Sequence, residues 1–132
     1  MAESNLTAVD WLALFATLAA SGHRQHLRWL NTSRGQDMAI VRVEEVVYFK
    51  ADDKYTVVAT AEGESLIRKT IRELAAELDP DAFWQIHRST IVNATAIAGV
   101  KRDFRGRMEL RLKTRPEILH VAETYHARFR IS

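Results

Sequence analysis

The densest group of chemically versatile side chains in the sequence lies in residues 83–93. His87, Arg88 and Ser89 follow one another there, with apolar residues on both sides. A loop that offers a guanidinium fork, a hydroxyl and an imidazole is well suited to contact phosphate groups and guanine. For Arg88 we favour such a contact over an ordinary surface charge. His87 is interpreted equally well as a core histidine that bonds to the backbone.

Asn93 closes the same segment and has two interpretations. An asparagine at the end of a strand commonly caps the turn that follows, here residues 94–96. Its amide can also read a base edge. We favour the capping role, because short polar side chains bond readily to nearby backbone groups.

Sequence motifs that indicate catalysis or metal binding are weak or absent. The chain has no cysteine, which excludes disulfides and cysteine-based zinc sites. His23 and His26 are three residues apart and could share a helical face, but no convincing carboxylate partner stands nearby. We find no HExxH, nucleophile elbow or phosphate-cradling glycine loop. We therefore expect no enzyme, no metal site and no cofactor.

The distribution of charge is more informative than the net charge of +2. In residues 36–84 acidic side chains outnumber basic ones, whereas residues 85–115 contain eight Lys and Arg but only Asp103 and Glu109 as acids. A domain with one strongly basic segment can present a positive face despite a nearly neutral total. Such a face is either a solvated surface or a nucleic-acid contact.

The elements that must position these residues are short strands for the most part. Apolar and β-branched runs predict strands at 38–43, 46–51, 55–60, 65–68 and 118–121, and a hairpin of 97–101 with 108–112. Thr70 and Glu73 match the capping box and predict a short helix that ends before Pro80. A last short helix is expected at 123–130. The fold class is therefore mostly β (α+β), built of small antiparallel sheets with short helices.

The beginning of the chain differs from the rest. Residues 5–20 predict a helix, and residues 22–26 and 31–35 are polar and loop-like. We accordingly expect an N-terminal linker helix and arm in residues 1–35 and a separate domain in residues 36–132. No apolar run approaches the ~20 residues that a membrane-spanning helix needs, and we expect a cytoplasmic protein.

The sequence resembles the LytTR family of bacterial DNA-binding domains. Residues 83–93 are similar to the family hallmark, which has an aromatic residue, then His-Arg-Ser, apolar residues and an Asn. Residues 46–56 look like the first hairpin of the family, 65–74 like its strand-to-helix step, and 121–125 like the start of its last helix. The resemblance covers residues 37–129. It implies an elongated fold whose loops enter successive major grooves of double-stranded DNA.

The resemblance also implies roles for individual residues. The loop 52–56 would contact the DNA backbone, with one base contact near Thr56; Arg88 would read a base and Ser89 would bind phosphate; residues 124–126 would reach a second groove. With the basic segment, the assigned DNA-binding residues are Lys50, Lys54, Tyr55, Thr56, His87, Arg88, Ser89, Lys101, Arg102, Arg105, Thr124, Tyr125, His126 and Arg128. The chain departs from the family at Ala122-Glu123, where Ser-Arg is usual, so that Arg128 or Arg130 would have to compensate.

We therefore predict sequence-specific binding of duplex DNA by the effector domain of a transcription regulator, and we expect that regulator to be a two-component response regulator. Such domains commonly follow a receiver domain, which we expect to be missing here, and tandem direct repeats are the expected binding site. The alternative is a protein-interaction or dimerisation module. In that module the basic hairpin and the apolar side chains of Trp11, Leu12 and Phe15 would bind a partner or a second copy.

Overall fold

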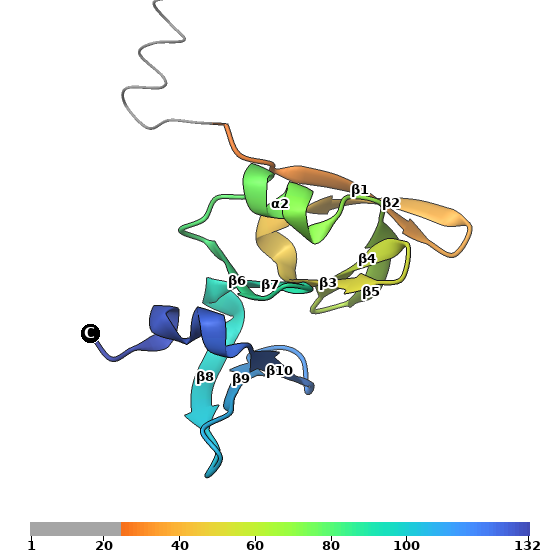
Figure 1. Cartoon of the computed structure of the whole chain (residues 1–132). Coiled ribbons are helices and arrows are strands. Elements are labelled where there is room, and N and C mark those ends of the chain that lie inside the picture. The colour runs from red at the N-terminus through yellow and green to blue at the C-terminus, as the bar shows by residue number, and fades with distance from the viewer. Residues whose placement is uncertain (1–24) are drawn as a thin grey trace, which may run out of the picture.

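The computed structural model describes residues 25–132, which form two antiparallel sheets joined by short helices (Figure 1). The seven-stranded sheet has the order β2-β1-β5-β4-β3-β7-β6 and contains β1 (Trp29–Arg34), β2 (Asp37–Arg42), β3 (Val46–Asp52), β4 (Tyr55–Thr60), β5 (Gly63–Ile67), β6 (Phe83–His87) and β7 (Thr90–Asn93). The three-stranded sheet has the order β10-β9-β8 and contains β8 (Ile97–Arg102), β9 (Met108–Leu112) and β10 (Ile118–Val121). The helical elements are the α-helix α2 (Ile71–Glu77) and the 3-10 segments η1 (Val43–Glu45), η2 (Ala94–Ala96) and η3 (Glu123–Phe129). The predicted mostly β class is confirmed.

One local prediction is wrong: residues 31–34 are not a loop but part of β1. This strand pairs with β2 along its whole length and also meets β5. Residues 31–35 were predicted as a loop because they are polar. In the strand, however, side chains alternate between the two faces: Leu30 and Thr32 face the core, while Asn31 and Ser33 face solvent. The division at residue 35 stays a prediction about folding units, although strand pairing crosses it. The predicted helix at 5–20 lies outside the described residues.

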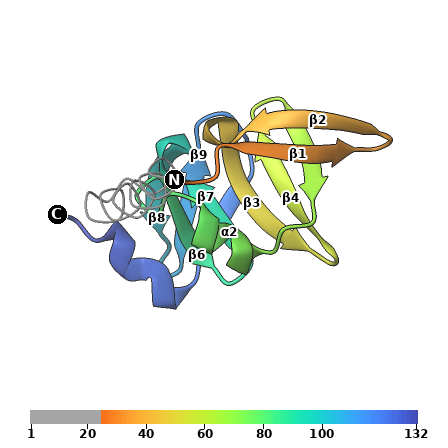
Figure 2. The same cartoon turned by 90° about the horizontal axis from the view of Figure 1, so that it is seen from above.

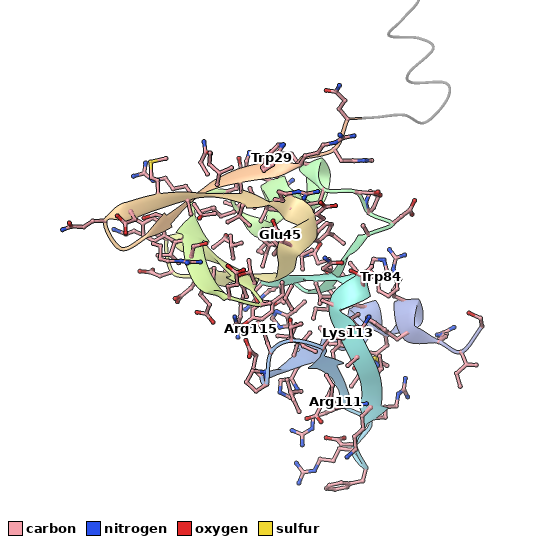
Figure 3. All side chains as sticks on the ribbon, turned by 180° about the vertical axis from the view of Figure 1, so that it is seen from behind. Trp29, Glu45, Trp84, Arg111, Lys113 and Arg115 are labelled. Atoms are coloured by element: carbon pink, nitrogen blue, oxygen red, sulfur yellow. The ribbon has the colours of Figure 1, made fainter. Side chains whose placement is uncertain are left out.

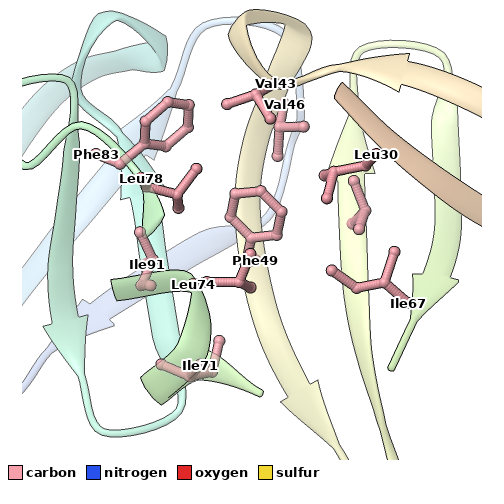
Figure 4. Close-up of a cluster of buried hydrophobic side chains, with 11 residues drawn as sticks. Leu30, Val43, Val46, Phe49, Ile67, Ile71, Leu74, Leu78, Phe83 and Ile91 are labelled. Atoms are coloured by element: carbon pink, nitrogen blue, oxygen red, sulfur yellow. The ribbon is translucent and has the colours of Figure 1, made fainter. Parts of the chain in front are cut away.

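Helix α2 covers one face of the seven-stranded sheet. Its start matches the predicted capping box, since the Thr70 hydroxyl accepts from the Glu73 N–H and the Glu73 carboxylate accepts from the Thr70 N–H. The helix buries Ile71 and Leu74 against Phe49 of β3 (Figure 4). This first core cluster extends to Leu30 of β1, and so it holds the helix and the β1–β2 hairpin on the same side.

The opposite face of the same sheet is covered by the three-stranded sheet. Tyr48 of β3 and Val92 of β7 pack there with Leu110 of β9 and with Ile86, in a second core cluster. Because β3 is covered on both faces, its first four residues are all buried, which explains the continuous apolar run that its sequence shows.

Arg115, in the loop between β9 and β10, ties the three-stranded sheet to the β4–β5 hairpin of the seven-stranded sheet. Its guanidinium donates to the Thr60 carbonyl at 2.7 Å and pairs with the carboxylate of Glu64 at 2.8 Å, both from the β4–β5 hairpin. It also pairs with Glu117 at 2.6 Å, and the Glu117 carboxylate accepts from the Tyr48 hydroxyl at 2.7 Å. We call Tyr48, Glu64, Arg115 and Glu117 the sheet clamp.

The sheet clamp predicts a loss of stability at alkaline pH. Burial, and then the hydrogen bond to Glu117, raise the pKa of Tyr48 from 10.0 to about 12. The unfolded chain therefore releases the phenol proton first, and the free energy of unfolding should fall as the pH rises from about 10 to about 12. Urea unfolding at a series of pH values measures this. In Tyr48→Phe the decline over that interval should be shallower; an unchanged slope would contradict the assignment.

Candidate nucleic-acid interface

The predicted central loop is the two-residue turn between β6 and β7, formed by Arg88 and Ser89. His87 organises this turn. Its Nδ1 accepts a hydrogen bond from the Ser89 N–H at 3.1 Å and lies 2.8 Å from the Ser89 hydroxyl. A neutral imidazole that accepts at Nδ1 carries its proton on Nε2. His87 is half-buried rather than a core histidine, and its bond to a backbone amide belongs to the turn itself.

The neighbouring strand holds the turn in place. The Ala51 N–H of β3 donates to the Ser89 carbonyl at 2.8 Å, and Thr90 pairs with Lys50 of β3. The turn is therefore fixed to β3 on one side by backbone hydrogen bonds, while β6 forms the edge of the sheet. Lys50 itself is exposed next to it. A rigid support of this kind lowers the entropy lost when the turn binds a partner.

Arg88 is exposed at the tip of this turn and forms no ion pair with any residue in the range 25–132. Beside it lies a shallow depression that the β3–β4 turn and the beginning of α2 complete. Its basic lining residues are Lys54, Arg68, Arg72 and Arg88. The structure thus brings Lys54, Tyr55, Arg88 and Ser89 together, as the sequence predicted.

Arg68 and Arg72 were missed as candidates for this site. The sequence did hold a signal, because Thr70 of the capping box lies between them, at the point where β5 ends and α2 begins. This junction lines the same depression as the Arg88 turn and the β3–β4 turn. In the β3–β4 turn Asp53 has a left-handed backbone with φ of 54°. No local pattern in the sequence reveals that approach of three separate segments.

Thr56 does not face the depression as a free hydroxyl. It is 2% exposed, and its hydroxyl donates to the Lys69 carbonyl at 2.6 Å. Its side chain therefore positions the strand end that carries Arg68. Tyr55, 42% exposed, is the solvent-facing member of the pair.

A second group of predicted residues lies on the β8–β9 hairpin. Lys101, Arg102 and Arg105 are exposed there. The Asp103 carboxylate accepts from the backbone N–H groups of Arg105 and Arg107 at 2.8 and 2.9 Å, and it pairs with the Arg107 side chain. Partial burial acts to raise the pKa of Asp103, but these bonds, those of Arg107 first, hold that pKa below its ordinary value.

Segment η3 carries the last predicted residues. Thr124 and Arg128 are exposed, and the Arg128 guanidinium lies 5.1 Å from the Trp84 ring centroid. The ring of Tyr125 packs against the second core cluster, and His126 Nε2 lies 3.0 Å from the Val121 carbonyl. Tyr125 and His126 therefore fix the segment, while Thr124 and Arg128 face solvent.

Three segments lie along one side of the molecule: the β3–β4 turn, the β6–β7 turn and η3 (Figure 2). We call them the contact row. A second depression connects η3 with the β8–β9 hairpin, and its basic lining residues include Arg102, Arg105, Arg107 and Arg130. On the opposite side Arg111 and Lys113 are exposed on the three-stranded sheet (Figure 3), where the Arg111 guanidinium lies over Gly99 of β8. The exposed Lys and Arg side chains are consequently spread over both sides of the molecule, and Arg88 belongs to the contact row.

Within residues 25–132 there is no group of three or more histidine and acidic side chains placed to hold a metal ion. Nor does a helix in this range have the length and apolar character needed to cross a membrane.

Comparisons with known proteins converge on one family. The model of the LytTr DNA-binding domain matches residues 36–131. A response regulatory protein of Vibrio cholerae is 41% identical over 74% of this chain and 39% of its own length. The positive alginate biosynthesis regulatory protein of Pseudomonas aeruginosa is 33% identical over 70% of this chain and 36% of its own.

A further relative is the CO-responsive transcriptional regulator of Rhodospirillum rubrum, which is 40% identical over 62% of this chain and 33% of its own length. The chain thus matches between a third and two fifths of the length of each of these curated relatives. A solved LytTr DNA-binding domain of a response regulator from Bacillus cereus superposes with a TM-score of 0.72 at 26% identity, over 79% of this chain and 94% of its own.

Proposed function

Because the chain belongs to the LytTR family of DNA-binding domains, we propose that it recognises a specific duplex sequence through the turns of the contact row. The observation that carries this proposal is Arg88, an exposed guanidinium that no described acid neutralises, on a turn that backbone pairing fixes to the neighbouring strand β3. A family of DNA-binding domains gives no support to an enzymatic role.

Arg88 would read a base. Its planar fork matches the O6 and N7 acceptors of guanine in the major groove, a contact that Lys, as a point charge, reproduces poorly. The surrounding groups would hold the backbone: Ser89 through its hydroxyl, and Lys50, Lys54, Arg68 and Arg72 through charge. Arg88 would therefore supply sequence specificity, and the surrounding groups would supply affinity for any duplex.

Segment η3 would contact the next groove through Thr124 and Arg128, two of its exposed polar side chains. Glu123 is exposed at the start of this segment and would repel phosphate. We therefore assign less of the binding free energy to η3 than to the β6–β7 turn.

For the whole protein we propose a cytoplasmic response regulator in which a receiver domain controls this effector domain. The support is that several relatives are named as regulators and are much longer than the match. Tandem direct repeats would place two copies on one face of the duplex, and homodimerisation would raise their apparent affinity through a high effective concentration.

Selection of bound sequences from a random duplex pool tests the proposed function directly. We expect one enriched motif, and for that motif the logarithm of the affinity should fall linearly and steeply with the logarithm of salt concentration. The reason is that Lys and Arg release counterions from phosphates, with a slope of about −0.9 for each phosphate neutralised. Titrations at four salt concentrations measure it. A pool that shows no enrichment would exclude sequence-specific binding and leave a protein-interaction module.

A further inference from the structure

The tip of the β8–β9 hairpin carries an aromatic side chain that no core requires. Phe104 is 92% exposed, far more than Tyr55 or Trp29. Burial of an aromatic ring is strongly favourable, so a ring held in water at the end of a hairpin is available to bind a partner. The hairpin extends away from the sheets (Figure 1), and the tip is therefore accessible from several directions.

The surroundings of Phe104 are basic. Arg102, Arg105 and Arg107 lie within three residues of it and also line the depression shared with η3. The Arg105 guanidinium lies 5.5 Å from the Phe104 ring centroid. Of these arginines, Arg107 pairs with Asp103, while Arg102 and Arg105 form no ion pair with any described residue. The chemistry around the ring thus fits a polyanion.

The tip is also rigid. The Asp103 carboxylate accepts from two backbone N–H groups of the turn, and the Asp103 N–H donates to the Arg107 carbonyl at 2.9 Å. Gly106 has φ of 81°, a left-handed backbone that a glycine adopts without strain, and its N–H donates to the Asp103 carbonyl at 3.0 Å. A closed turn of this kind presents Phe104 in a fixed position.

We propose that Phe104 is a wedge, which inserts between two base pairs in the minor groove beside the site held by the contact row, with Arg102 and Arg105 on the flanking phosphates. Apolar side chains that insert in this way unstack one base step and kink the duplex. The inference rests on the proposed function, since the wedge requires a duplex already bound by the row. The wedge would bend the duplex, which goes beyond the base and phosphate contacts proposed for Arg88 and the contact row.

The experiment measures affinity and bending on the duplex that the pool selects. Donor and acceptor dyes at the two ends report the bend, and 2-aminopurine at each flanking position reports unstacking. The variants are Phe104→Ser, Phe104→Leu, which keeps an apolar wedge, and the control Ile40→Ser, which removes an apolar side chain with 71% exposure on β2.

We expect Phe104→Ser to bind about tenfold more weakly and to reduce the bend by roughly 20° or more. Its 2-aminopurine signal should be lost at one step, while its base preference stays that of the unchanged protein. Phe104→Leu should retain most of the bend, and Ile40→Ser should match the unchanged protein in all three measurements.

Three results would overturn the wedge. If the unchanged protein binds the selected motif and Phe104→Ser bends it equally, the wedge is wrong and the proposed function stands. If Phe104→Ser changes only self-association in sedimentation, the tip contacts protein instead. A protein that selects no motif at all refutes the proposed function, and the wedge with it.

Discussion

Arg88→Ala should lose discrimination at a single base pair, at a cost of about 1–3 kcal/mol for the preferred base and much less for the other three. The turn should survive this change, because Arg88 is exposed and the bonds that close the turn involve His87, Ser89 and Ala51. Competition titrations with duplexes substituted at each position of the selected motif measure the effect.

Two further variants make the result specific to the guanidinium. Arg88→Lys keeps the charge but not the planar fork, so it should lose base preference while the salt dependence stays nearly the same. Arg72→Ala removes a cation from the same depression and should weaken all duplexes equally. Equal losses on every sequence for Arg88→Ala would reassign Arg88 to a phosphate contact.

Asn93→Ala should lower the free energy of unfolding by about 2–4 kcal/mol, because several backbone groups lose their partner at once. Asn93 is 6% exposed. Its amide group donates to the carbonyls of Glu44 and Val46, and its oxygen accepts from the N–H and the hydroxyl of Thr95. Urea unfolding followed by tryptophan fluorescence measures the loss.

The matched control is Asn31→Ala on β1, where the side chain is exposed and the loss should stay within about 0.5 kcal/mol. A loss below about 1 kcal/mol for Asn93→Ala would mean that water or a shifted backbone replaces its bonds. Its base preference should be unchanged, since a buried amide has no access to DNA.

Asn93 also shows how far local sequence reasoning reached. The prediction that it caps the turn at 94–96 is confirmed, because a cap involves only residues adjacent in the chain. The capping box of α2 and the β8–β9 hairpin were predicted correctly for the same reason. The bonds from Asn93 to Glu44 and Val46 were not predictable, since they join residues almost fifty positions apart.

The candidate site divides in the same way. A loop that carries Arg88 was predicted from residues 83–93, but the strands β6 and β7 on either side of it were not. The family comparison agrees with the resemblance. The burial of Thr56 was not predicted, because a strand-end threonine looks equally suited to solvent and to a backbone carbonyl such as that of Lys69. The strand β1 was missed because its register depends on β2 and β5 rather than on its own composition.

The sheet clamp fixes the position of the two sheets relative to each other. Arg115 joins the loop after β9 to the β4–β5 hairpin, so the sheet that carries Phe104 and the sheet that carries Arg88 cannot slide past each other without breaking its bonds. On the proposed operator, a domain built this way would hold its two contacted stretches at a fixed spacing. One base pair inserted between the two contacted stretches would rotate them relative to each other by about a tenth of a helical turn, and the protein has no joint there to follow that rotation.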